Sequence, residues 1–195
     1  ADQFDVDPPP GYAEAHCGAG EGRVVLYAGS FFDNEGVPTL LRAAKQVLAA
    51  APDTRFVIVG GHPAEAARAL AGLAGELGIA ASVIFTGVLP SLEMPFLFRC
   101  ADILTAPKAD NILNRAGVPT KLVEYLASGR PVVVSAVGDI PSIVEDGVEA
   151  VLVPPDDARA LAAAIMDLLA DPARRERIAA AGRNKVRLRH DVGAA

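Results

Sequence analysis

Residues 117–139 read GVPTKLVEYLASGRPVVVSAVGD and contain the unit from which the whole chain is built. Pro119 and Thr120 precede a run with apolar residues at helical spacing, and Gly129 stands where that helix is expected to stop. The next residues, PVVVSA at 131–136, are apolar and β-branched without alternation, which is typical of a strand buried on both faces. The stretch predicts a helix that leads into a buried strand.

The same alternation runs through the chain from residue 23 onward. Short apolar runs predict strands at 23–29, 55–61, 82–87, 102–107, 131–136 and 149–155. Helical patterns lie between and after them, at 39–51, 63–78, 92–101 (interrupted by Pro95), 119–129, 141–147, 157–172 and 173–190. Buried strands separated by helices predict an α/β fold, and right-handed crossovers make it a Rossmann-like, doubly wound parallel sheet with helices on both faces.

Composition limits the domain count and the class of protein. The 195 residues are 51% hydrophobic and 22% charged, which suits one well-buried domain, expected over residues 23–195. Residues 1–22 contain DVDPPPG and are expected to be an irregular, linker-like segment, because proline blocks helix formation. A formal charge of −6 argues against a nucleic-acid partner.

The apolar runs and the cysteines indicate in which cellular compartment the protein is expected. Apolar runs are all shorter than the ~18–20 residues that cross a bilayer, and no basic-then-apolar leader opens the chain. With only Cys17 and Cys100, a disulfide framework is not expected, and we predict a reduced, cytoplasmic setting.

Familiar catalytic motifs are missing from the sequence. It has no Gly-x-Gly-x-x-Gly after the first strand, no P-loop and no Gly-x-Ser-x-Gly elbow, which disfavours a nicotinamide dehydrogenase, a P-loop NTPase and an α/β-hydrolase. His16, His62 and His190 lack zinc-type spacing, and no Asp-x-Asp pair ends a strand. We therefore expect neither a metal nor a bound cofactor.

The loops beyond the strands' carboxyl ends are where a ligand is expected. The longest, residues 107–120, leads into the helix of the opening stretch. Pro119 leaves the first helical amides free, so they and the helix dipole favour an anion, and Lys121 adds positive charge. Glu124 shares a face with Lys121 and is suited to bind a vicinal diol. An anion beside a diol describes a nucleoside diphosphate. The plainer alternatives are a solvated Lys121–Glu124 pair and a capping role for Thr120.

Six segments in order carry a family resemblance. They are RVVLYAGSFFDNEGVPTLLRAA, RFVIVGG, VIFTGVLP, CADILTAP, PTKLVEYLASGRPVVVSAVGDIPSIVEDGVEAVLVPPDD and ALAAAIMDLLADPARRERIAAAGR. Together they resemble the C-terminal, donor-binding half of a GT-B glycosyltransferase of family 4, also called group 1. The resemblance implies an enzyme that transfers a sugar, with retention and without a metal, from a nucleotide diphosphate sugar to an acceptor hydroxyl. It also implies a missing N-terminal half that binds the acceptor and associates peripherally with a membrane.

The resemblance assigns donor-binding roles to individual residues. Glu124 matches the second glutamate of the family's Glu-x7-Glu motif and would bind the ribose. The remaining donor-binding positions are the diphosphate loop and helix start Val118, Pro119, Thr120 and Lys121, the first-strand turn Gly29 and Ser30, and the base-pocket loop Gly87, Val88 and Pro90.

The sequence departs from the family pattern at three positions. Ala116 stands where the motif's first glutamate would be, Ser30 replaces an arginine and Glu35 replaces a lysine. Lys108 and Arg115 in the long loop are the candidate cations to substitute, with mobile loop charges that bind no ligand as the plainer alternative, and no catalytic residue is assigned.

Several alternatives stay open. The departures also fit a non-catalytic nucleotide-binding module, and a sugar-nucleotide epimerase would bind the same donor. The base, UDP or GDP, is not fixed by the sequence. The charged pattern at 173–190 is expected to be a solvated helix, with docking on an anionic membrane as the alternative.

Overall fold

The computed structural model describes residues 4, 6–18, 22–117 and 120–192. Its centre is a six-stranded parallel sheet of order β3-β2-β1-β4-β5-β6. The strands are β1 Val24–Ala28, β2 Arg55–Val59, β3 Val83–Gly87, β4 Ile103–Ala106, β5 Val132–Ser135 and β6 Val151–Val153. The chain winds outward from β1 to β3, returns to the other side of β1, and winds outward again to β6. The doubly wound, Rossmann-like prediction is confirmed.

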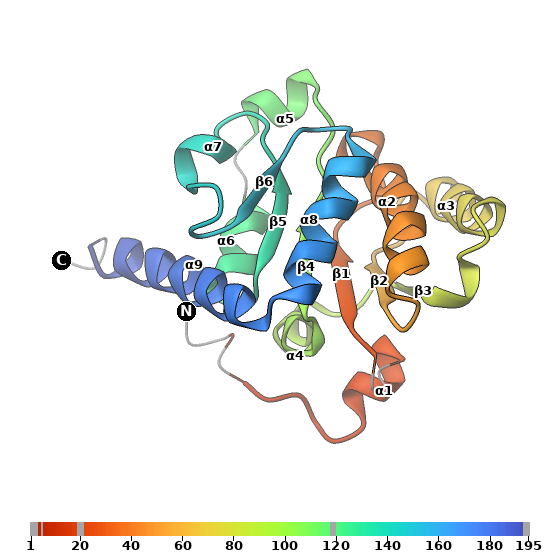
Figure 1. Ribbon diagram of the computed structural model, residues 1–195, viewed down its shortest axis with the longest axis horizontal. Helices are drawn as coiled ribbons and strands as arrows, with labels where there is room; N and C mark the ends of the chain where they lie inside the picture. The colour runs from red at the N-terminus through yellow and green to blue at the C-terminus, as the bar shows by residue number, and fades with distance from the viewer. Residues whose placement is uncertain (1–3, 5, 19–21, 118–119, 193–195) are drawn as a thin grey trace.

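Helices cover both faces of the sheet (Figure 1). One face carries α2 Val37–Ala50, α3 Ala64–Glu76 and α8 Ala158–Ala170, and the other carries α1 Tyr12–Cys17, α4 Met94–Cys100, α6 Thr120–Ala127 and α7 Ile140–Ile143. The remaining elements are α5 Ile112–Ala116, α9 Pro172–Val192 and the 3-10 turns η2 Asp33–Glu35, η3 Ala80–Ser82 and η4 Ser91–Glu93. The long helix α9 packs against α6 and α8.

Strand β1 shows why the strands read as unbroken apolar runs. Val25 and Tyr27 pack into the core under α2 and α8, whereas Val24, Leu26 and Ala28 pack into the core under α4 and α6. All five side chains are buried. Because each face is covered by helices, no position of the strand needs a polar residue.

The segment before β1 corrects one expectation. Residues 12–17 form α1, and Cys17 and Phe4 are buried against the α4 side of the domain. The prolines do prevent helix formation, but only up to Gly11, whose φ of 78° turns the chain into the helix. The prediction of an irregular segment over 1–22 was therefore wrong for residues 12–17.

Two further expectations about helices were also wrong. Pro95 does not interrupt a helix; α4 begins at Met94, so Pro95 lies in the first turn, where a missing N–H costs no hydrogen bond. Within the long loop 107–120, residues Ile112–Ala116 form α5, whose N-cap Asn111 accepts a hydrogen bond from the Asn114 N–H at 3.0 Å.

Candidate functional site

The site lies where the two halves of the sheet separate. In the described strands, β1 pairs with β4 only at Val25–Ile103 and Leu26–Leu104. Beyond these pairs the Ala28 backbone bonds to a side chain instead: its N–H donates to the Tyr125 hydroxyl at 2.9 Å, and that hydroxyl donates to the Ala28 carbonyl at 3.2 Å. Tyr125 therefore fixes α6 to the carboxyl end of β1. Sheets of this order bind ligands at this reversal of strand order.

A cavity of about 260 Å³ opens beside this anchor. Its lining brings together Gly29 and Ser30 after β1, Val88 after β3 and Lys121 from the first turn of α6. Four of the predicted donor-binding residues, from three separate segments, thus meet at one cavity. The sequence did not assign a donor-binding role to the other lining residues, which include His62 and Met94.

A second cavity, of about 420 Å³, contains Glu124. Lys121 and Met94 line both cavities, so the two spaces adjoin at these side chains. Phe4 and Val6, from the segment before β1, close part of the second cavity. Lys121 therefore lies between the cavity lined by Gly29 and the cavity lined by Glu124.

Lys121 and Glu124 form an ion pair on the surface of α6. Their Nζ and Oε2 atoms are 3.5 Å apart, and the side chains are 37% and 47% exposed. Thr120, the first described residue of α6, is exposed. Val118 and Pro119, predicted to contribute amides to a diphosphate site, lie outside the described residues.

The two loop cations are already paired with carboxylates. Lys108 Nζ lies 3.0 Å from Glu35 Oε1, with only 20% and 19% of the side chains exposed. Arg115 makes two hydrogen bonds to Asp110, at 2.6 and 2.8 Å. That hydrogen bonding lowers the pKa of Asp110 and raises the pKa of Arg115. The sequence led us to expect that these two cations would pair with a diphosphate. In the structure each is instead paired with a carboxylate.

A polar network holds the Glu35–Lys108 pair in place. The Tyr27 hydroxyl donates to the Ser30 carbonyl at 2.6 Å and to Glu35 at 3.2 Å. Burial, followed by the Glu35 charge, raises the pKa of Tyr27, so this hydroxyl stays a donor. Buried Asn114 donates to the carbonyls of Asn34 and Ala109 at 2.6 and 2.7 Å. These bonds tie η2, after β1, to the loop after β4.

Two glycines at this edge are needed by the protein's own packing. A Cβ on Gly29 would lie 2.4 Å from the Tyr27 hydroxyl. Gly36 has a φ of 70°, and a Cβ there would lie 1.7 Å from the Pro107 carbonyl. Gly29 is thus required even without a ligand. The other two predicted base-pocket positions, Gly87 and Pro90, flank the cavity residues Val88 and Leu89.

A comparison with protein families now decides the assignment. The family model described as Glycosyl transferases group 1 matches residues 22–171. The chain belongs to this family.

Individual relatives agree with this assignment. A GDP-mannose-dependent alpha-(1-6)-phosphatidylinositol monomannoside mannosyltransferase of Mycolicibacterium smegmatis is 33% identical over 186 residues, covering 94% of this chain and 48% of the relative. A sucrose-phosphate synthase structure from Thermosynechococcus elongatus is 30% identical with a TM-score of 0.80, covering 95% of this chain and 46% of that one.

A second solved structure has nearly the same extent as this chain. It is the C-terminal domain of a glycosyl transferase group 1 family protein from Francisella tularensis, with a TM-score of 0.76 and 22% identity, covering 96% of this chain and 97% of that one. This chain spans about half the length of the curated relatives that it matches. The fold is therefore one Rossmann-like half of the GT-B glycosyltransferase architecture.

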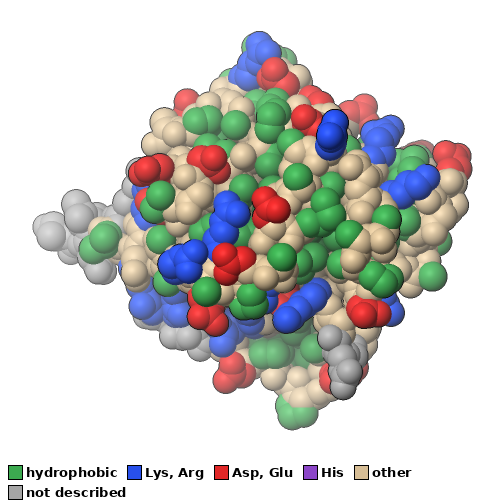
Figure 2. All heavy atoms as spheres, viewed as in Figure 1, with side chains coloured by type: hydrophobic (Ala, Val, Ile, Leu, Met, Phe, Trp, Pro, Cys, Tyr) green, Lys and Arg blue, Asp and Glu red, His purple; other side chains and the backbone are tan. Residues whose placement is uncertain are grey.

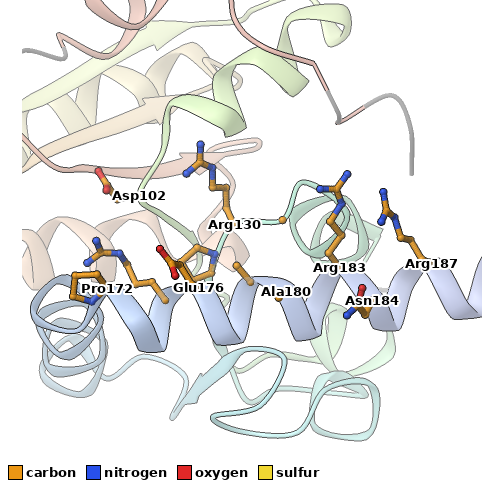
Figure 3. Close-up of a pocket in the computed structure, with 12 residues that line it drawn as sticks. Asp102, Arg130, Pro172, Glu176, Ala180, Arg183, Asn184 and Arg187 are labelled. Atoms are coloured by element: carbon orange, nitrogen blue, oxygen red, sulfur yellow. The ribbon is translucent and has the colours of Figure 1, made fainter.

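The glycosyltransferase domain has a larger cavity, of about 490 Å³, on the side of the sheet where the strands begin (Figure 3). It lies between α9 and the residues that precede β4 and β5. Two of its arginines cap the C-terminal ends of helices. Arg130 donates to the Arg99 carbonyl in the last turn of α4, and Arg175 donates to the carbonyls of Leu168 and Leu169 in α8. Burial, followed by the nearby Arg99 charge, lowers the pKa of Arg130.

The surface over α9 carries both signs of charge. Figure 2 shows blue and red side chains interleaved there. Lys185 Nζ forms an ion pair with Glu149 Oε1 at 2.9 Å. Among residues 4, 6–18, 22–117 and 120–192, no helix is long and apolar enough to span a bilayer. The same residues contain no group of three or more His, Cys, Asp and Glu side chains placed to hold a metal ion.

Proposed function

We propose that this domain binds the nucleotide diphosphate sugar of a retaining glycosyltransferase. The observation that carries the proposal is the meeting of Gly29, Val88, Lys121 and Glu124 at two adjoining cavities beyond the carboxyl ends of the strands. Lys121 would face the diphosphate and Glu124 the ribose hydroxyls, with the base near Val88. A carboxylate that accepts hydrogen bonds from two vicinal hydroxyls is a specific polar contact for a sugar ring.

The charge of the diphosphate would be met by Lys121 and by the backbone amides of the first turn of α6. This arrangement asks for no metal ion. Lys108 and Arg115 are held by Glu35 and Asp110, so we assign them to shaping the crevice between β1 and β4 instead of contacting phosphate in the resting domain.

Exposed apolar side chains beyond the carboxyl ends of the strands support the proposal that a partner covers this surface. Phe32, Val88, Leu92, Ile112 and Leu113 are 49%, 76%, 87%, 77% and 67% exposed. They lie in the segments that follow β1, β3 and β4. We propose that an N-terminal, acceptor-binding half covers this surface and supplies the acceptor hydroxyl. Any peripheral membrane contact would come through that half. The free cysteines Cys17 and Cys100 support a reduced, cytoplasmic location.

GDP-mannose is the first donor to test, because a relative 33% identical to this chain is named for it. Isothermal titration calorimetry of this chain with GDP, UDP and GDP-mannose, each with and without EDTA, tests the proposal. We expect saturable binding of GDP or UDP, equal in the two conditions. Amide NMR shifts should map to Gly29, Val88 and Glu124, and not to the cavity around Arg130. Absence of heat and of NMR shifts with every nucleotide at millimolar concentration would refute donor binding.

A test of whether the anomeric configuration is retained requires the complete enzyme. In a protein that joins this domain to its acceptor-binding half, NMR of the product should show the anomeric configuration of the donor. Release of free nucleoside diphosphate without acceptor would instead favour the epimerase alternative.

A further inference from the structure

The only two cysteines of the chain, 83 residues apart in sequence, are neighbours in the fold. Cys17 ends α1 and Cys100 ends α4. The two helices pack against each other (Figure 1), and both cysteines pack into the same apolar cluster, where the two thiols interact. Both are free thiols.

The two thiols differ in access and in acidity. Cys17 is fully buried, with 0% of its surface exposed, whereas Cys100 is partly exposed. The hydrogen bond to Cys100 and burial raise the pKa of Cys17. The hydrogen bond from Cys17, helped by the positive charge of Arg130, lowers the pKa of Cys100 against the opposing effect of burial. Cys100 is thus the thiol that an oxidant can reach and the one that more readily forms the nucleophilic thiolate.

We propose that Cys17 and Cys100 form a reversible redox pair, in which Cys100 reacts first with a small disulfide and Cys17 then closes an intramolecular disulfide. The Cys100 thiolate attacks one sulfur of the small disulfide, the sulfur–sulfur bond breaks, and one small thiolate leaves. Cys17 then attacks the Cys100 sulfur of the mixed disulfide and displaces the second small thiolate. The two protein thiols lose two electrons, the small disulfide gains them, and the two thiol protons end on the released small thiols.

The bond would fasten the segment before β1 to the donor-binding face. Helix α1 already contacts this region, because the Tyr12 hydroxyl donates to Glu93 at 3.0 Å and the Tyr12 ring meets Phe96 with centroids 5.9 Å apart. Met94, in the first turn of α4, lines both candidate donor cavities. This consequence rests on the proposed function: oxidation would fix the chain that enters the domain relative to the donor site, whereas reduction would leave α1 able to move.

The test treats the native chain with oxidised glutathione and then maps its peptides without reduction. We expect loss of both free thiols, one intramolecular cross-link between the peptides that contain Cys17 and Cys100, and a higher melting temperature. Dithiothreitol should reverse all three changes. A glutathione adduct that persists on Cys100 beside a free Cys17 would overturn the proposal. So would a cross-link only between two chains, or a reaction that occurs only in urea.

Two variants assign the order of the steps. Cys17→Ala should trap glutathione on Cys100, and Cys100→Ala should leave Cys17 unreacted in the folded chain. The peptide map of the unaltered protein stands without these variants, so a folding defect in either does not remove the test. Nucleotide affinity is then compared between the reduced and oxidised chains. If the reduced chain binds no nucleotide, the proposed function fails while the cross-link result stands by itself.

Discussion

Replacing Glu124 with alanine separates the proposed nucleotide-binding role of this side chain from a merely structural one. The carboxylate is 47% exposed, and its ion pair with Lys121 spans 3.5 Å on the surface of α6. Exposed i,i+3 pairs contribute about 0.2–0.5 kcal/mol. Alanine also has the highest helix propensity. The free energy of unfolding should therefore change by less than about 0.5 kcal/mol.

The effect on nucleotide affinity should be much larger. A hydrogen bond to a charged group is worth about 1.5–3 kcal/mol. Since about 1.4 kcal/mol corresponds to a tenfold change in Kd, Glu124→Ala should weaken GDP or UDP binding by about 10- to 150-fold. Calorimetry measures the affinity, and urea unfolding followed by circular dichroism measures the stability. The same loss should not appear with inorganic pyrophosphate, which has no ribose.

Glu65 provides a matched control. It forms an i,i+3 ion pair with Arg68 on α3, at 3.4 Å and with even more exposed side chains, and it lines neither cavity. Glu65→Ala should match Glu124→Ala in stability and leave the nucleotide Kd unchanged. If the two variants bind nucleotide equally well, Glu124 does not hold the ribose and the assignment fails. If Glu124→Ala loses stability as well as affinity, the lost affinity cannot be ascribed to a ribose contact.

Three further substitutions test the scaffold around the site. Tyr125→Phe should lower the unfolding free energy by about 1–3 kcal/mol in urea, because it removes the hydroxyl that bonds both the N–H and the carbonyl of Ala28. Asp157→Ala should cost about 1 kcal/mol in the same assay, because the Asp157 carboxylate caps α8 by accepting two backbone hydrogen bonds at 2.9 Å. Burial raises the pKa of Glu149, but hydrogen bonds from a backbone N–H and from Lys185 outweigh burial and hold that pKa below 4.5. The wild type should therefore lose stability as the pH falls below 4.5, and Glu149→Gln should lose less over the same range, as melting temperatures across acid pH can show.

The sheet could be predicted from the sequence because its signal is local. Every strand is a short apolar run next to a helical pattern, and burial on both faces removes any need for alternation. Residues 12–17 show the limit of such reasoning. Three prolines make the segment look irregular, yet the Tyr12 ring packs on Phe96 of α4 and Cys17 is buried beside that helix. These tertiary contacts support a helix that local propensity does not indicate.

Spacing along a single helix predicts one part of the candidate site. Lys121 and Glu124 lie on one helix, so their shared face follows from spacing. The partners of Lys108 could not be predicted in this way. Glu35 is 73 residues away in sequence, and only the fold brings η2 beside the loop after β4. Asn114 and Tyr27, which hold this pair, carry no motif, although a polar side chain inside an apolar pattern is a usable signal for such a role.

The charges at the site explain which ion pair a nucleotide would replace. Lys108, Arg115 and Lys121 each face a carboxylate, so the three pairs together carry no net charge. Opening the Glu35–Lys108 pair would leave a mostly buried charge without a partner, which is costly. The Lys121–Glu124 pair is more exposed than the Glu35–Lys108 pair. It also spans 3.5 Å, whereas Arg115 makes two hydrogen bonds to Asp110 at 2.6 and 2.8 Å, so the Lys121–Glu124 pair opens at the least cost. A nucleoside diphosphate gives each of these two groups a new partner, phosphate for Lys121 and ribose hydroxyls for Glu124. Each of the two groups then keeps a polar partner, and this is the physical reason to place the donor on α6 and not on the loop cations.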